Sequence, residues 1–434
     1  MIGAGIFVLP GVAAATAGPA VALAFVLGGM ISLLTAISAS ELGTAMPRAG
    51  GSYFFVNHAL GPLFGSIAGW GNWMGLAFAS AFYALGFGSY VAVFFDMPSI
   101  DLIVMTLEPR QLGGLAAGSL FLVVNYVGAK ETGRLQNIIV ITLIGILAVF
   151  MAAGAMEADV STLTPLAPKG WDAVLPATAL VFVSFLGFAK ITTVAEEIKN
   201  PGKNLPIAVI GSVLIVTIIY AIVMVVLMGV INWDKLAGFG DTAVVEVAKI
   251  VLGPAGAVAL TIGGLLATAS SANASILASS RINFAMGRDR LVSNWLNEIH
   301  ERFKTPSRSI IVTGVLILAF ILIGDVKTLA KAGSVLHLIV YGMLNLALIV
   351  MRTANPPEYQ PDFKTPLYPF VPILGALTSF GLIAFMAPVE ILLSGLFVVG
   401  GVLWYFVYAR NRTEKQGILT RYILNRPEEM PDTA

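Results

Sequence analysis

Long apolar runs follow one another along almost the whole chain, separated by short stretches that contain charge, Pro or Gly. A run of roughly 17–25 mostly apolar residues is long enough to cross a bilayer as a helix. The sequence predicts twelve such segments, at residues 2–17, 20–40, 62–94, 112–128, 135–154, 175–195, 205–231, 252–284, 309–324, 328–351, 369–388 and 390–409. The first is too short to cross alone, and two are long enough to tilt or to extend beyond the lipid. The pattern therefore predicts an all-α integral membrane protein.

Composition supports this prediction and excludes several other classes of protein. The 434 residues are 57% hydrophobic and only 11% charged, whereas soluble chains carry about 25% charged residues. A net charge of +1 provides no basic surface for nucleic acid. There is no Cys, and three scattered His residues cannot form a three-His metal site. We therefore expect the lipid bilayer as a partner, and no metal, cofactor or nucleic acid.

The distribution of Lys and Arg predicts the orientation of the chain. The loops after segments 2, 4, 6, 8 and 10, together with the C-terminal tail, carry eighteen of the 25 basic residues, and the opposite side carries six. Because basic residues favour the cytoplasmic side, this excess places the C-terminus in the cytoplasm of a multi-pass protein of the cell membrane. The eighteen are Arg48, Lys130, Arg134, Lys199, Lys203, Arg281, Arg288, Arg290, Arg302, Lys304, Arg308, Arg352, Lys364, Arg410, Arg412, Lys415, Arg421 and Arg426.

Two of the segments are interrupted by glycine. The first opens with IGAGIFVLPG, and the sixth contains FLGF. Glycine weakens a helix, and a helix broken at the midplane leaves amides free for a carboxylate and carbonyls free for a cation. Glycine can also serve close helix packing, but these segments occupy matching positions in two halves. The pattern predicts a first repeat at 1–154, a second at 175–351, two further helices at 369–409 and a tail at 410–434, with the binding site at the breaks.

Two polar features lie inside predicted segments. Lys190 follows the second break, and a charge at the bilayer centre costs at least ~2.5–3.5 kcal/mol, so it marks a polar pathway. The alternative is that Lys190 lies one turn nearer the segment end and extends to the interface. In segment 8, Thr268, Ser271 and Ser275 share one helix face, which either packs against a neighbour or lines a path for an ion or substrate.

The loop at 292–304 has a helical pattern of its own. Trp295, Ile299 and Phe303 recur at intervals of four residues, with charged residues between them. This spacing predicts a short amphipathic helix lying on the membrane surface. The alternative is a solvated connector.

Four blocks of sequence, in order, resemble the amino acid–polyamine–organocation transporters. The blocks are IGAGIFVLPG, the stretch ELGTAMPRAGGSYFFVNHALGPLFGSIAGW, the stretch FLGFAKITTVAEEIKNPGKNLP, and SSANASILASSRINFAMGRD. Together they extend from the first segment to the eighth. The resemblance implies a LeuT-type bundle of five plus five helices in inverted repeats, with two extra helices.

The resemblance also implies roles for residues at matching positions. Backbone amides of the first break would bind the carboxylate of an amino acid substrate, and carbonyls of the sixth segment would bind its amino group. Phe188 matches an aromatic gating position, and Ser271 and Ser275 match positions beside a sodium-like cation site. The implied backbone positions are Ile2, Gly3, Ala4, Gly5 and Ile6 in the first segment, and Phe185, Leu186 and Gly187 in the sixth.

This sequence departs from the family pattern in three places. Met1 falls within the first-helix motif, so the first half of that helix would precede residue 1. Leu143 stands where many proton-driven members carry Lys, and Ala189 with Lys190 follows the Gly-Phe pair where an acidic residue is common. Because a lysine in a low-dielectric pocket can release its proton near neutrality, the hypothesis is that Lys190 is the titrating or charge-balancing group. Its charge would also disfavour cationic substrates.

The expected function is therefore secondary active transport of amino acids by alternating access. Coupling to protons is favoured over sodium, and neutral or acidic amino acids are favoured as substrates. An exchanger of the same family and a non-transporting membrane sensor are the alternatives. An intramembrane enzyme would need clustered His, Asp, Glu or Cys at depth, which the sequence lacks, so no catalytic residue is expected.

Overall fold

The computed structural model describes residues 1–434 except 96–97, 102–105, 129–131, 194, 414–416 and 425–434. Lys130, Lys415 and Arg426, which contribute to the predicted orientation, lie outside the described residues. The main helices are α1 (Ala4–Ala17), α2 (Val21–Ala45), α3 (Gly51–Leu60), α4 (Pro62–Phe94), α5 (Pro109–Val127), α6 (Thr132–Glu157), α7 (Val174–Val181), α8 (Gly187–Thr192), α9 (Pro201–Val230), α10 (Trp233–Gly238), α11 (Ala243–Arg288), α12 (Ser307–Ile323), α13 (Val326–Ala354), α14 (Phe370–Ile383), α15 (Pro388–Trp404) and α16 (Ile418–Leu424).

The described chain is a helical bundle, which confirms the all-α prediction. Its strands are two short antiparallel ones, β1 (Ile100–Asp101) and β2 (Thr106–Leu107). By length and hydropathy alone, eight stretches of the described residues could cross a membrane, and α12 and α14 are shorter apolar helices. The predicted segment at 112–128 forms α5, which is not among the eight.

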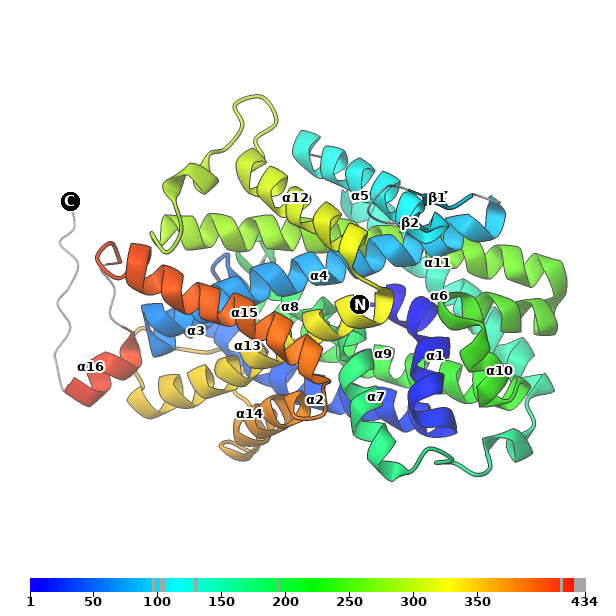
Figure 1. The fold of residues 1–434 in the computed structure, drawn as a ribbon. Coiled ribbons are helices and arrows are strands. Elements are labelled where there is room, and N and C mark those ends of the chain that lie inside the picture. Colours follow the sequence, from blue (N-terminus) through cyan, green and yellow to red (C-terminus); the bar gives the residue numbers. More distant parts are fainter. Residues whose placement is uncertain (96–97, 102–105, 129–131, 194, 414–416, 425–434) are drawn as a thin grey trace.

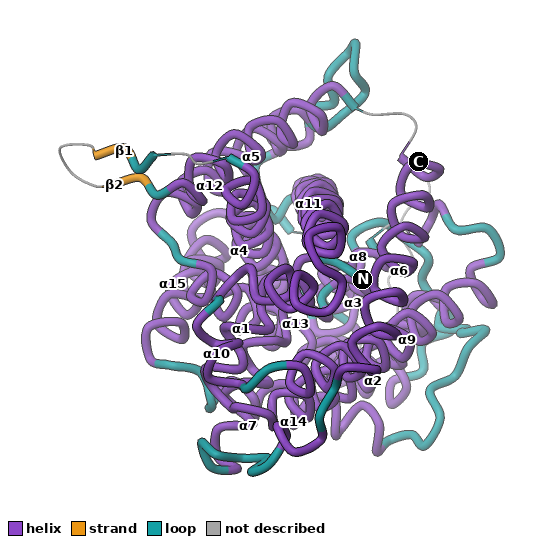
Figure 2. Tube along the Cα trace, turned by 90° about the vertical axis from the view of Figure 1, so that its right-hand side faces the viewer, coloured by secondary structure: helices purple, strands orange, loops and turns teal. Residues whose placement is uncertain are grey.

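Helices distant in sequence pack side by side in this bundle (Figures 1 and 2). The 33-residue α4 packs against α5, α11 and α13, while α2 packs against α9. The predicted start of segment 8 coincides with a kink in α11, where Gly253 has a φ of 67° and Pro254 follows it. Glycine adopts a positive φ without the steric cost of a side chain, so the kink falls where the sequence allows it.

The sixth segment is interrupted as predicted, and α1 begins within the Gly-rich motif of the first segment. Gly3 is extended, with a φ of −151°, and α1 begins at Ala4. The sixth segment is divided into α7, a 3₁₀ turn η4 (Phe182–Phe185) and the six-residue α8. Helix α1 packs against both α7 and η4, so the two breaks meet in the folded protein.

The predicted surface helix at 292–304 is wrong. Only a 3₁₀ turn, η7 (Asn294–Asn297), forms there. The Ser293 hydroxyl accepts from the Trp295 amide, and His300 Nδ1 accepts from the amides of Arg302 (3.2 Å) and Phe303 (3.4 Å). These local hydrogen bonds satisfy backbone donors in a non-helical conformation and so compete with helix formation.

A buried ion pair fixes the loop that follows α13. The Glu41 carboxylate is fully buried near the end of α2. It accepts hydrogen bonds from Arg352 Nε at 2.6 Å and from Arg352 Nη2 at 2.8 Å. The Tyr359 hydroxyl (2.8 Å) and the Thr365 amide (2.6 Å) also donate to it. Four donors therefore satisfy one carboxylate, which compensates for removing it from water.

Candidate functional site

The two breaks approach so closely that glycine is required on the α1 side. A Cβ added at Gly5 would collide with the side chain of Ser184 and would lie 2.8 Å from its Cα. A Cβ added at Gly3 would collide with the hydroxyl of Ser271 on α11. The two glycines therefore allow the start of α1 to pack closely against both the sixth segment and α11.

The start of α1 presents backbone donors in a buried place. Ile2, Gly3, Ala4, Gly5 and Ile6 are all buried, and the N-cap residue Gly3 has no side chain with which to cap the helix, although its amide bonds to the Tyr220 hydroxyl. The first amides of a helix lack intrahelical partners, and the helix dipole is positive at this end. An uncapped N-terminus of this kind can bind an anion such as a carboxylate.

The interrupted sixth segment presents acceptors opposite these donors. Regular α-helical hydrogen bonding ends where α7 gives way to η4, which leaves carbonyls available near the break. The Tyr83 hydroxyl lies 3.5 Å from the Val183 carbonyl oxygen. The Ser184 hydroxyl, next to Gly5, is buried and has no hydrogen-bond partner among the described residues. An unsatisfied buried hydroxyl is costly unless a ligand or water completes it.

Aromatic side chains surround the break. Phe188 packs on Tyr341 of α13 with ring centroids 5.0 Å apart, and Phe185 packs on Tyr220 of α9 at 5.6 Å. The Tyr220 hydroxyl donates to the Met1 carbonyl at 3.2 Å. The Tyr341 hydroxyl is buried and unpartnered within the described part of the chain. Phe185 and Phe188 were expected here from the sequence. Tyr220 and Tyr341 lie on helices whose sequence contains no motif that indicates a binding site.

Lys190 turns toward α11 and not toward the end of its own helix. Its Nζ donates to the Ser275 hydroxyl at 2.6 Å and lies 3.5 Å from the Ser271 carbonyl oxygen. The same Nζ is 5.1 Å from the centroid of the Tyr83 ring, a cation–π distance. The structure thus brings together three residues that the sequence analysis selected separately.

The other selected positions have different surroundings. The Thr268 hydroxyl donates to the Gly264 carbonyl of its own helix, and its methyl group lies against Gly86, so Thr268 serves packing. Leu143 is fully buried in the apolar core. Leu186, also fully buried, connects η4 to α8.

The charges around Lys190 are unbalanced. Across the described ranges, no carboxylate lies within 4.0 Å of its Nζ. Among the described residues, its charge acts on His337 of α13 and on the α-amino group of Met1, and its Nζ lies over the ring of Tyr83 on α4. Its hydrogen-bond partners are neutral oxygens. Such a charge is expensive to bury.

A bundle of membrane-crossing helices in which the start of one helix meets an interrupted helix at a polar centre defines a class: multi-pass membrane transporters. Comparison with known proteins identifies the family. Residues 1–409 match the family described as "Amino acid permease". The chain belongs to this family, within the amino acid–polyamine–organocation superfamily. Its members are transporters and not enzymes.

Several characterised relatives are similar over most of the chain. A methylthioribose transporter of Bacillus subtilis is 31% identical, and the match covers 95% of this chain and 91% of the relative. The branched-chain amino acid permease BcaP of the same organism is also 31% identical, with the same two coverages. The vacuolar cationic amino acid transporter 4 of Arabidopsis thaliana is 30% identical over 82% of this chain and 61% of the relative.

Proposed function

We propose that this protein moves an amino acid across the cell membrane as a proton-coupled secondary transporter. The observation that carries the proposal is the contact between the uncapped start of α1 and the interrupted sixth segment. One break offers hydrogen-bond donors and the other offers acceptors. A zwitterion needs both within a few ångströms.

The two ends of the substrate backbone have distinct sites in this proposal. The carboxylate binds the amides of Gly3, Ala4, Gly5 and their neighbours Ile2 and Ile6. The amino group binds carbonyls of Phe185, Leu186 and Gly187, and the unpartnered Ser184 hydroxyl completes the polar contacts. Alternating access then requires that this site open first to one side of the membrane and then to the other.

Lys190 supplies the coupling. Its ammonium bonds to Ser275 and approaches the Ser271 carbonyl, so in this proposal it occupies the place of a bound cation. Protonated, Lys190 holds the sixth segment against α11. Deprotonated, it releases that contact, so the two protonation states favour different arrangements of the helices. Sodium coupling would require that a second cation bind beside this ammonium, which charge repulsion disfavours.

The surroundings favour a neutral substrate side chain, with acidic ones next. Phe185, Phe188 and Tyr341 offer apolar contact, and the Lys190 charge repels a second cation. The BcaP relative is named for branched-chain substrates and agrees with this preference. Methylthioribose has neither a carboxylate nor an amino group, so it would leave the donors of α1 without an anion.

The test is uptake into proteoliposomes that contain the purified protein. Labelled leucine, glutamate, arginine and methylthioribose are supplied one at a time, under an imposed proton gradient or an imposed sodium gradient. We expect leucine uptake that the proton gradient drives, with glutamate weaker and arginine excluded.

Other outcomes separate the alternatives. Sodium-driven uptake would retain amino acid transport but refute the role of Lys190. Uptake that requires amino acid inside the vesicle would indicate an exchanger. If folded protein transports only methylthioribose, the zwitterion site is refuted, and if it transports and exchanges nothing, a sensor is favoured.

A further inference from the structure

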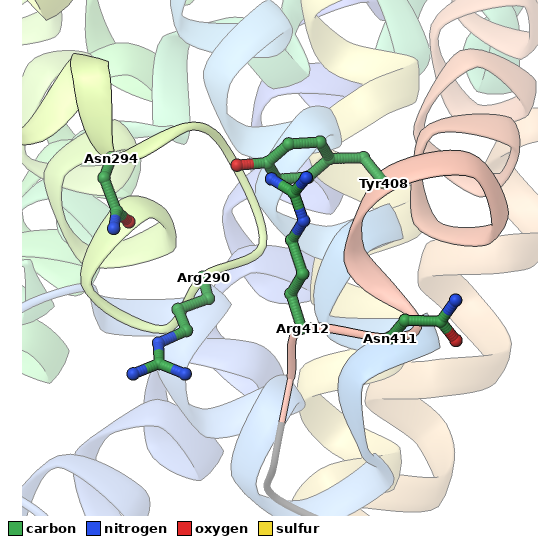
Figure 3. A pocket seen from close by; sticks show the side chains of 5 residues that line it. All are labelled: Arg290, Asn294, Tyr408, Asn411 and Arg412. Carbon is green, nitrogen blue, oxygen red and sulfur yellow. The ribbon is translucent and has the colours of Figure 1, made fainter.

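The surface pocket between the loop after α11 and the end of α15 is not arranged around one ligand. Its lining residues are Arg290, Asn294, Tyr408, Asn411 and Arg412. Figure 3 shows the side chains of Arg290 and Asn411 directed away from Arg412, so these groups do not converge. Buried polar groups that the proposed substrate and coupling sites do not use lie in the interior instead, along α13.

Polar residues form a buried stripe along α13. Its members Lys331, Ser334, His337, Tyr341 and Asn345 follow one another at intervals of three or four positions, which places them on one side of the helix. None of them is more than 8% exposed. Ionisable residues inside a membrane mark ion or proton pathways by default, and this stripe contains a lysine and a histidine.

The stripe begins at an ion pair that is incompletely bonded. Lys331 Nζ lies 3.6 Å from Oε1 of Glu390 in the first turn of α15, and each side chain is at most 10% exposed. The other carboxylate oxygen, Glu390 Oε2, is buried and has no hydrogen-bond partner among the described residues. Such an oxygen is costly to bury, and binding a proton would reduce that cost. In the orientation predicted from the basic residues, this end of α13 faces the outside.

His337 lies six positions further along the stripe. Its Nδ1 is 2.8 Å from the Gly333 carbonyl oxygen. Because a carbonyl oxygen can only accept, the neutral ring carries its proton on Nδ1, and Nε2 is an acceptor. The described part of the chain provides no donor to Nε2. The ring fits against α4 because residue 75 is glycine, where an added Cβ would lie 2.6 Å from His337 Nδ1.

The stripe reaches the surroundings of Lys190 at His337 and Tyr341. The charge of Lys190 acts on His337. The Tyr341 ring packs on Phe188, two positions before Lys190, with centroids 5.0 Å apart, and the Tyr341 hydroxyl is buried and unpartnered among the described residues. Unpartnered polar groups therefore extend from the outer ion pair to the proposed coupling site.

We propose that this stripe is the route by which a proton from the outside reaches Lys190. Glu390 binds the proton at Oε2 and becomes neutral, so Lys331 loses its counter-charge and releases a proton toward His337 Nε2. The two groups are roughly 9 Å apart along the helix axis, so bridging water carries this step. The imidazolium then passes a proton to the neutral amine of Lys190, and Glu390 returns its own to Lys331. One proton has moved inward, and every group except Lys190 has regained its first state.

This proposal rests on the coupling role proposed for Lys190, and its test compares two measurements on proteoliposomes. One is uptake of labelled leucine driven by a proton gradient. The other is counterflow, in which labelled leucine exchanges for unlabelled leucine without net proton movement, so that Lys190 needs no new proton.

The variant His337→Gln cannot carry a proton through the stripe. It should reduce proton-driven uptake about a hundredfold, the lower end of the contribution of a positioned proton-transfer group, and leave counterflow unchanged. His58→Gln, on α3 and outside the stripe, is the matched control and should change neither measurement. If proton-driven uptake by His337→Gln equals that of the wild type, the route is wrong and the proposed function stands.

The outer end of the stripe is tested with the double variant Lys331→Met/Glu390→Leu. Replacing both members of a buried ion pair by apolar residues of similar size preserves folding, whereas Glu390→Gln alone leaves a buried charge unpaired. The double variant should show the same slow proton-driven uptake with normal counterflow. Loss of counterflow as well, in folded protein, would assign these residues to substrate binding and overturn the route. Sodium-driven uptake by the wild type would refute the proposed coupling and the route together.

Discussion

Glu41 and Lys190 are both charged residues within stretches long enough to cross a membrane, but their surroundings are opposite. Glu41 is fully buried and has a bidentate arginine, a phenol and a backbone amide as partners. Lys190 has a serine hydroxyl, a more distant carbonyl and the face of a tyrosine ring. The first charge is neutralised in place, and the second is only solvated by neutral groups.

This difference separates stability from function. An ion pair whose charges are neutralised and whose hydrogen bonds are all made is not stabilised by a change of protonation state. It therefore fixes the positions of the elements that contribute to it. A charge that is solvated but not neutralised can change its state at modest cost when its surroundings change. We therefore expect substitutions at Glu41 to affect folding, and substitutions near Lys190 to affect transport in a protein that still folds.

The largest effect is expected for Glu41→Ala. Removing the carboxylate leaves the Arg352 charge without its partner, which costs about 3–5 kcal/mol for a buried pair. The unfolding temperature of the detergent-purified protein should fall sharply, while Glu157→Ala, at an exposed position at the end of α6, should be near wild type. The double variant Glu41→Ala/Arg352→Met should recover part of the loss. If Glu41→Ala unfolds at the same temperature as Glu157→Ala, the ion pair does not stabilise the fold.

Gly5→Ala should reduce uptake on the order of a hundredfold, since a displacement of about 1 Å at a binding centre can cost that much, and should also lower stability, because the added Cβ would lie 2.8 Å from the Ser184 Cα. The added methyl group collides with Ser184 and separates the donors of α1 from the sixth segment. Gly145→Ala on α6 is the control, because nothing lies within 4 Å of a Cβ there. Equal uptake by the two variants would show that the close approach of the breaks is not needed.

Lys190→Gln tests the charge that lacks a counterion. We expect substrate binding to persist, and uptake to become insensitive to pH over the range in which the wild type varies, because glutamine cannot exchange a proton. Lys249→Gln, at an exposed position on α11, should keep the wild-type profile. A Lys190→Gln protein whose pH profile matches that of the wild type would refute the coupling role.

The smallest effect on stability is expected at Asp325, whose carboxylate is partly exposed and has hydrogen-bond partners. The Asp325 carboxylate caps α13 by accepting from the amides of Lys327 (2.9 Å) and Thr328 (3.1 Å). Partial burial raises its pKa, but hydrogen bonds from Thr328 and Lys327 outweigh burial, so the pKa lies below the ordinary value. The stabilisation is present above the unfolded-state pKa of about 3.9 and is lost as the pH falls through the folded-state value.

Asp325→Ala should therefore lower stability at neutral pH by at most about 1 kcal/mol, at the low end for a helix cap because the residue is exposed. The difference from wild type should vanish in acid. Thermal unfolding at several pH values measures both effects. Asp234→Ala, whose exposed carboxylate does not cap its helix, is the comparison. A difference from wild type that persisted in acid would assign the effect to something other than the charge.

The segments and the breaks could be predicted because they are local. Apolar length and the glycines at positions 3, 5 and 187 act within a few residues; α1 begins at Ala4, and the sixth segment is interrupted just before Gly187. The helix expected at 292–304 failed although its periodicity was correct. The side chains of Ser293 and His300 accept hydrogen bonds from backbone amides and so stabilise a different local backbone, which the periodicity does not reveal.

The partners of the buried charges could not be predicted, because they come from distant parts of the chain. Arg352 is 311 positions from Glu41, and Ser275 is 85 positions from Lys190. From the sequence, Glu41 was only part of a motif, whereas Lys190 was recognised as a charge at depth. The hydroxyl face of segment 8 was also recognised, but its contact with Lys190 depends on how α8 and α11 pack.

The loop after α13 has a mechanical consequence for the molecule. Because Tyr359 and Thr365 bind the same carboxylate as Arg352, the ends of α2 and α13 and the loop between α13 and α14 form one clamped joint. A rotation that opens this end must carry the joint as a rigid body or break four hydrogen bonds together. We therefore expect the hinge points of the transport cycle to lie elsewhere in the molecule.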